Sequence, residues 1–406
     1  MASDSNKIEK KGLEFSMLHR TMEFFHRPAT WPLYLVVLAA LAVAALVTAV
    51  WRGVGRLRRV APLAGFVHLA FLGADAFLLH RLPRYRVSYG PWKAQGAALA
   101  APRTAAALLV PLFAGVLGAT GTLAAHAGLQ GLGSLLLYWG ALVEPRRLEL
   151  TEMELSLPGL PAGAPPIRLL HISDIHLERP GQREDDLVAL AEASRPDLIV
   201  ITGDYLNLSY NRDPEAVEHV CCLLRRLNAP HGVYAVLGSP PVDLREVVVP
   251  LFEGMPVRLL RDEWVTVDLG EGRCVHILGM DCNHDPEEDG ERLEALSASG
   301  PSGSVRLLLY HSPEMMPGAK EQGFDLYLCG HTHGGQVRLP YYGAVLTSSK
   351  LGKQYVMGHY AEEGTHLYVS RGVGFEGLSA PRVRFLSPPE ITLFTLRPAA
   401  PTPDAA

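Results

Sequence analysis

Residues 326–333 read Leu-Tyr-Leu-Cys-Gly-His-Thr-His, a short apolar run that ends on a glycine and two histidines. Residues 168–173 lead in the same way into Asp174-Ile175-His176, and residues 198–202 lead into Gly203-Asp204. Short apolar runs closed by a turn are typical of buried strands. Polar side chains just past the carboxyl ends of such strands lie where an α/β fold places its site. The three motifs therefore predict one site at the edge of a sheet.

The same alternation continues through the second half of the chain. Helical periodicity covers 181–193 and 213–227, and Asp213-Pro214 is typical of a helix start. Alternating strands and helices predict an α/β layered domain over 146–397. The Pro/Ala-rich residues 398–406 are predicted to be a disordered tail. Strands are expected at 168–173, 198–202, 233–237, 274–279, 306–310, 326–329, 367–370 and 391–396.

Residues 1–145 have a different composition, rich in Ala, Leu and Val and poor in acids. About 20 apolar residues cross the hydrocarbon core of a bilayer, and residues 32–50 and 60–80 each meet that length. Residues 104–143 are too long for one crossing, and Gly128, Gly131 and Gly133 could carry a turn between two. We therefore predict a membrane domain of about four transmembrane helices. The alternative is a soluble helical core.

Charge sets the expected orientation and partners. With the N-terminus inside, twelve basic residues fall on the inner side of the membrane and four on the outer side. The positive-inside rule then places both ends in the cytoplasm, with the second domain on the cytoplasmic face of the cell (inner) membrane. Asp75 lies inside a span and is expected to pair within the bundle. The net charge of −5 gives no sign of a nucleic-acid partner.

The residue types at the strand ends suit a pair of divalent cations. Two cations about 3.5–4 Å apart can bind both the attacking and the leaving oxygen of a phosphate. Asp204 is the natural bridge, because a carboxylate has two oxygens to share. Carboxylate and imidazole together favour manganese, iron or zinc over calcium. Each residue alone could be structural, as a helix cap or strand end, but together they predict metal binding. The six candidate ligands are Asp174, His176, Asp204, His311, His331 and His333.

The segment from about 146 to 396 resembles the calcineurin-like metallophosphoesterases, and most closely their membrane-anchored bacterial branch. The family pattern is D-x-H, G-D, G-N-H-[DE], a lone His and G-H-x-H. The resemblance implies a four-layer α/β/β/α sandwich and hydrolysis by a metal-bound hydroxide. It implies that Asp174, His176 and His333 hold the first metal and that His311 and His331 hold the second. Asp204 would bridge the metals, and Asp204, His331 and His333 would be the catalytic residues.

One corner of the pattern is altered. Where the family has G-N-H-[DE], this chain has Gly238-Ser239-Pro240-Pro241. A serine hydroxyl is a weak neutral ligand, so Ser239 leaves the second metal site uncertain, and Pro240 offers no side-chain donor. Water could fill the vacant position, or the domain could have lost catalysis. A side chain from 281–285, Asp-Cys-Asn-His-Asp, could also substitute, although a polar loop is the favoured interpretation there.

Several other residues are secondary candidates. Arg371 and His359 could contact phosphate at the rim, although a structural role is favoured for each. Asn207 could support a ligand or simply form a turn. Gly334 and Gly335 would let the loop backbone approach the site closely.

We therefore predict a membrane-anchored, metal-dependent phosphoesterase. Its substrate would be a phosphodiester, phosphomonoester or pyrophosphate. A lipid-linked substrate is one option, because some relatives cleave the pyrophosphate of a UDP-linked lipid A precursor. The alternative is a catalytically impaired metal-binding or regulatory membrane module.

Overall fold

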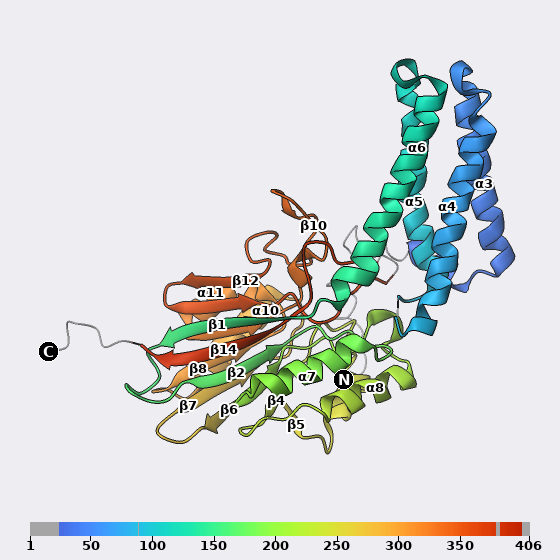
Figure 1. Cartoon of the computed structure of the whole chain (residues 1–406). Coiled ribbons are helices and arrows are strands. Elements are labelled where there is room, and N and C mark those ends of the chain that lie inside the picture. Colours follow the sequence, from blue (N-terminus) through green and yellow to red (C-terminus); the bar gives the residue numbers. More distant parts are fainter. Residues whose placement is uncertain (1–23, 88, 379–381, 400–406) are drawn as a thin grey trace. The chain divides into compact units, whose positions relative to one another are not determined.

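The computed structural model describes residues 24–87, 89–378 and 382–399 (Figure 1). Contacts divide the chain into two units. Among these residues, one unit reaches to Val143 and includes 377–378 and 382–383, and the other comprises Glu144–Glu376 with 384–399. The predicted tail falls mostly on 400–406, outside the described residues. Pro398, which was assigned to that tail, is instead the last residue of a strand.

Two six-stranded sheets form the centre of the larger unit. The first has the order β1 (Glu149–Leu157), β14 (Glu390–Pro398), β2 (Ile167–Ile172), β3 (Leu198–Ile201), β4 (Val233–Ala235), β5 (Val257–Leu259). The second has the order β12 (Gly358–Glu362), β13 (Thr365–Val369), β9 (Leu326–Cys329), β8 (Val305–Leu309), β7 (Cys274–Gly279), β6 (Glu263–Asp268). Strands β1 and β14 pair in parallel although they begin and end the domain, so they join its two ends (Figure 1).

Neighbouring residues of one strand face different cores, because side chains alternate along a strand. In β2, Leu169 belongs to the core between the two sheets, whereas Leu170 packs with the helices outside the first sheet. Outside the second sheet, Leu308 packs with a separate cluster of helical residues. The outer helices are α7 (Gln182–Ser194), α8 (Pro214–Leu224) and α9 (Arg245–Val248) by the first sheet, and α10 (Pro286–Ala298) and α11 (Met316–Glu321) by the second.

This arrangement confirms the predicted α/β/β/α sandwich. All eight predicted strands are present, as β2, β3, β4, β7, β8, β9, β13 and β14. The two predicted helices correspond to α7 and α8, and Asp213 caps α8 by accepting from the Glu215 backbone. The strands that the sequence did not predict include β1, β5, β6 and β12, which are the four outermost strands of the two sheets.

The smaller unit is a bundle of apolar helices. Its helices are α3 (Leu33–Gly53), α4 (Ala61–Arg81), α5 (Trp92–Leu109) and α6 (Ala114–Tyr138). Three segments are long and apolar enough to cross a membrane, and the third, Trp92–Arg146, contains both α5 and α6. The prediction of four crossings remains a prediction.

The predicted turn within the third segment is wrong. Gly128, Gly131 and Gly133 all lie inside α6, and the helical backbone breaks instead at Gly118, whose φ of 68° and ψ of 179° are not helical. Gly133 serves packing, because a Cβ there would lie 3.2 Å from Nη1 of Arg103.

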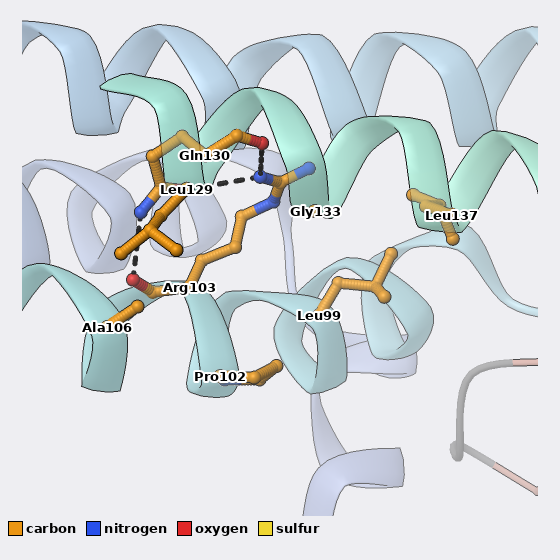
Figure 2. A pocket seen from close by; sticks show the side chains of 8 residues that line it. All are labelled: Leu99, Pro102, Arg103, Ala106, Leu129, Gln130, Gly133 and Leu137. Carbon is orange, nitrogen blue, oxygen red and sulfur yellow. Dashed lines mark hydrogen bonds between the residues drawn. The ribbon is translucent and has the colours of Figure 1, made fainter. Parts of the chain in front are cut away.

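Arg103 links three helices of the bundle. Its Nε and Nη2 donate to the two carboxylate oxygens of Asp75 on α4, at 2.6 and 2.9 Å. On α6, Arg103 donates to Gln130, and the Gln130 side chain donates back to the Arg103 carbonyl (Figure 2). Arg103 also donates to the hydroxyl of Ser134 on the same helix. The pairing of Asp75 within the bundle is thus confirmed. Both charges are buried, so each depends on the other.

Replacing Arg103 with leucine should destabilise the protein by about 3–5 kcal/mol, because Asp75 would remain as an unpaired buried charge. Asp75→Leu/Arg103→Leu removes both charges and should recover much of the loss. Thermal unfolding of the full chain in detergent measures both effects. Arg56→Leu, which changes an exposed arginine, is the control. Equal melting temperatures for Arg103→Leu and Arg56→Leu would contradict this prediction.

Candidate metal centre

Two groups of donors, all buried except the half-buried His331, lie at the ends of strands from both sheets. The first comprises Asp174, His176 and His333, whose candidate ligand atoms lie within 4.8 Å of one another. Nε2 of His176 lies 3.1 Å from Nε2 of His333. Oδ1 of Asp174 lies 4.0 Å from Nε2 of His176 and 3.7 Å from Nε2 of His333. One oxygen and two nitrogens therefore converge on a single point.

The second group comprises Asp204, His311 and His331. Nε2 of His311 lies 3.3 Å from Oδ2 of Asp204. The hydroxyl oxygen of Ser239 lies among these donors, 3.1 Å from Nε2 of His311 and 3.3 Å from Nδ1 of His331. The structure thus brings Ser239 to the position at which the sequence left a weak ligand.

Asp204 connects the two groups. Its Oδ2 lies 3.5 Å from Nε2 of His176 in the first group, close to its distance from His311 in the second. Its other oxygen, Oδ1, accepts from the Ser239 backbone at 2.6 Å, which fixes the orientation of the carboxylate. This position is the one that a bridging carboxylate requires.

The turns that carry these side chains have an unusual backbone. Five of the six predicted ligands have a left-handed φ, which is uncommon for residues other than glycine and is concentrated at functional sites. The neighbouring glycines are needed for space: a Cβ at Gly238 would lie 2.1 Å from Oδ1 of Asp204, and one at Gly330 would lie 2.0 Å from Oδ2 of Asp174. The five φ values are 50° at Asp174, 44° at His176, 55° at Asp204, 70° at His331 and 51° at His333.

The two carboxylates are buried together, and this shapes the electrostatics. Burial raises the pKa of Asp174. For Asp204, the effect of burial is outweighed by the charge and hydrogen bond of His311, and the pKa falls. In turn, Asp204 overcomes the effect of burial on His311 and raises its pKa to about 10. Burial, with the charge of His311, lowers the pKa of His331 to about 3. Asp204 therefore requires a positive partner, which a divalent cation can supply in place of a proton.

Outer hydrogen bonds fix the ring orientation of the histidines, as is usual around metals. Nδ1 of His311 lies 2.7 Å from the Thr202 carbonyl, which leaves Nε2 directed at Asp204. Nδ1 of His176 lies 3.1 Å from Oε2 of Glu376. These contacts leave Nε2 of both rings available as a ligand. The donors present therefore fit divalent cations.

Asp243 is a supporting residue that sequence reasoning missed. Its carboxylate accepts from the backbone of Asp204 at 2.8 Å, of Tyr205 at 2.9 Å and of Gly238 at 2.7 Å. Burial, together with the charge of Asp204, raises the pKa of Asp243 to about 7. It ties the turn after β3 to the turn after β4. Glu376 was also missed, and neither residue stands in a motif that could have indicated it.

The secondary candidates have structural contacts. Arg371 pairs with Glu149 and Glu390. His359 stacks on His366 at a ring distance of 5.1 Å. Asn207 caps a short turn by accepting from the Ser209 backbone.

Gly334 and Gly335 have φ values of 63° and 84°, as a loop that approaches the site closely requires.

A purely polar loop was the favoured interpretation of 281–285. The structure instead brings His284 against the second group, with its ring centroid 4.6 Å from that of His331.

Comparison with known proteins agrees with this geometry. Residues 167–335 match the family model of the calcineurin-like phosphoesterases. The chain is 33% identical over 289 residues to the metallophosphoesterase YkuE of Bacillus subtilis, covering 69% of this chain and 95% of YkuE. This chain belongs to the calcineurin-like phosphoesterase family. The resemblance on the sequence motifs is thereby confirmed, and the protein is a metal-dependent phosphoester hydrolase.

Two further relatives carry names that describe an activity. The phosphodiesterase YaeI of Escherichia coli is 29% identical over 239 residues, covering 57% of this chain and 83% of YaeI. The UDP-2,3-diacylglucosamine pyrophosphatase LpxG of Chlamydia muridarum is 23% identical over 313 residues, covering 63% of this chain and 91% of LpxG. The family therefore includes proteins named for both diester and pyrophosphate cleavage.

Asp243→Ala should lower the free energy of unfolding of the metal-free phosphoesterase by at least about 2 kcal/mol, because it leaves three buried N–H groups unsatisfied. Thermal unfolding after chelation of metals measures the loss. Asp268→Ala is the matched control, since Asp268 accepts one backbone N–H in an exposed turn. The supporting role of Asp243 would be refuted if the two variants melted alike.

Proposed function

We propose that the protein uses two divalent cations to hydrolyse a phosphodiester or pyrophosphate bond in a lipid-linked substrate at the bilayer surface. The observation that carries the proposal is the pair of donor groups on either side of Asp204. The cations would be manganese, iron or zinc, because the donors are carboxylates and imidazoles. When bound, the cations would polarise the phosphoryl oxygens and activate water near neutral pH.

The residues of the chain have separate parts in this proposal. Asp204 would hold both cations, and its carboxylate is kept in place by the backbone of Ser239. His333 would hold the first cation and His331 the second, so the substrate phosphate would bind between the two groups. Orientation of the reacting groups is a large part of catalysis in such sites.

The apolar unit supports a substrate at the membrane. Three segments of this unit are long and apolar enough to cross a bilayer. A hydrolase held beside a bilayer meets lipid-linked phosphates at high local concentration. The name of LpxG, a diacylglucosamine pyrophosphatase, supports the same class of substrate. The distribution of basic residues supports a catalytic domain on the cytoplasmic face.

Loss of a residue that supports a metal ligand typically lowers activity about 10–100-fold. Because His333→Ala removes a ligand itself, it should lower the rate of hydrolysis by more than that. The assay uses the full chain in detergent with manganese, and compares an aryl phosphodiester, an aryl phosphomonoester and a lipid pyrophosphate. His359→Ala is the control for loss of an exposed histidine. If wild type cleaves none of these above the His333→Ala background, the protein is an impaired binding module instead.

The membrane side can be tested with reporters fused after residue 147. A fluorescent reporter that folds in the cytoplasm should be bright at this position, and alkaline phosphatase, which is active only outside, should be inactive. The reason is the excess of basic residues on the inner side of the predicted spans. The opposite pattern would place the catalytic domain on the outer face.

A further inference from the structure

The second donor group lacks a strong ligand where the family has Asn. Ser239 offers a neutral hydroxyl there, 3.4 Å from Oδ2 of Asp204, and the following Pro240 has no side-chain donor. Asp204, His311 and His331 remain, with two nitrogens and one shared oxygen. A cation that binds imidazole and carboxylate commonly takes at least four ligands. This position would therefore be weak unless another side chain contributes.

His284 lies directly beside this position. It comes from the loop after β7, in the second sheet, whereas Ser239 follows β4 in the first. The ring of His284 lies 4.6 Å from that of His331 and 6.2 Å from that of His311, measured between centroids. These are the two histidines of the second donor group. Three imidazoles from three different strand ends therefore surround the same corner of the site.

The two nitrogens of His284 have different surroundings. Nδ1 lies 3.6 Å from Sγ of Cys282, which in turn lies 3.3 Å from the Tyr310 hydroxyl. That hydroxyl donates to Oδ2 of Asp289 at 2.6 Å, so a chain of contacts holds the ring from behind. Nε2 of His284 is buried and has no hydrogen-bond partner among the described residues. A buried polar atom without a partner is costly, and an absent ligand is one explanation for it.

The backbone at His284 resembles that of the predicted ligands. Its φ is 56°, within the left-handed range found at Asp174, Asp204 and His331. The Lys350 side chain donates to the His284 carbonyl and secures the loop. The side-chain amide of the neighbouring Asn283 is bonded to another residue, because its Oδ1 accepts from Arg245 at 2.7 Å. Within this loop, His284 is thus the side chain available to the site.

We propose that Nε2 of His284 is a ligand of the second cation and replaces the Asn that the family has at the position of Ser239. This inference rests on the proposed two-cation site. The ligand missing from the turn after β4 in the first sheet would then be supplied by the loop after β7 in the second sheet. The loop 281–285, for which a purely polar role was the favoured interpretation, would then supply one ligand, His284.

Metal binding by the full chain in detergent tests this proposal. The protein is stripped with chelator and titrated with Co²⁺, whose visible absorption reports ligand number and whose content is measured by elemental analysis. Wild type should bind two Co²⁺ per chain. His284→Ala should keep one and bind the other at least about tenfold more weakly. His359→Ala, which removes an exposed histidine paired with His366, should retain both.

A rescue variant separates a ligand from a structural residue. Ser239→Asn in the His284→Ala background restores the family's own ligand and should recover the second Co²⁺. If His284→Ala lowers the metal-free melting temperature, His284→Leu, of similar volume, takes its place. Two Co²⁺ bound with unchanged affinity in the His284 variant would overturn the proposal, even if hydrolysis falls. Wild type that binds a single Co²⁺ would overturn it as well.

The proposed function fails by a different result. Wild type that binds two Co²⁺ but cleaves no phosphoester would refute hydrolysis, while the effect of His284 on the second Co²⁺ would still be measured. Conversely, active wild type with an unaltered Co²⁺ count in His284→Ala would refute only the role of His284.

Discussion

The burial of two carboxylates at one point is the constraint on which the rest of the domain depends. Asp174 and Asp204 are both buried, and burying such charges without partners is very costly. The fold meets this cost with imidazoles from both sheets and with backbone N–H groups, such as that of His331 on Asp174. His311 lowers the pKa of Asp204, and Asp204 raises the pKa of His311. Both changes favour positive charge beside the Asp204 carboxylate. Divalent cations meet the same requirement and would stabilise the fold as they bind.

The parallel strands of the two sheets determine where the metal-binding side chains lie. Strands β2, β3 and β4 run parallel, so the turns after them lie together at one edge, and β7, β8 and β9 repeat this in the second sheet. The sandwich brings the two edges together. The left-handed φ values and the glycines at 238 and 330 then allow the turns to approach more closely than side chains would permit. The strain in these turns is tolerated because two well-packed sheets hold their ends.

The strands that sequence reasoning predicted and those it missed differ in burial. Inner strands such as β3 are buried on both faces and form continuous apolar runs, which are visible in sequence. The four outermost strands have mixed patterns, as in β12, where exposed and half-buried residues alternate. The predicted ligands were found because they stand in motifs with fixed spacing. Asp243 and Glu376 act through contacts with residues distant in sequence, and no local pattern marks them. In α6 three glycines indicated a turn, but all three lie within the helix, and Gly133 packs closely against Arg103.

The altered turn after β4 shows why motif letters and site chemistry can differ. A motif describes one turn, whereas the cation position is shared by turns from both sheets. A donor lost from the first sheet can therefore be replaced by a side chain from the second without moving a strand. His284 has the location, the free nitrogen and the supporting contacts for this exchange. The hydroxyl of Ser239 remains within reach of the imidazoles of His311 and His331, which keeps this position polar. The chemistry of such a site depends on where the donors lie in space, and the order of residues along the chain is only one way to bring them there.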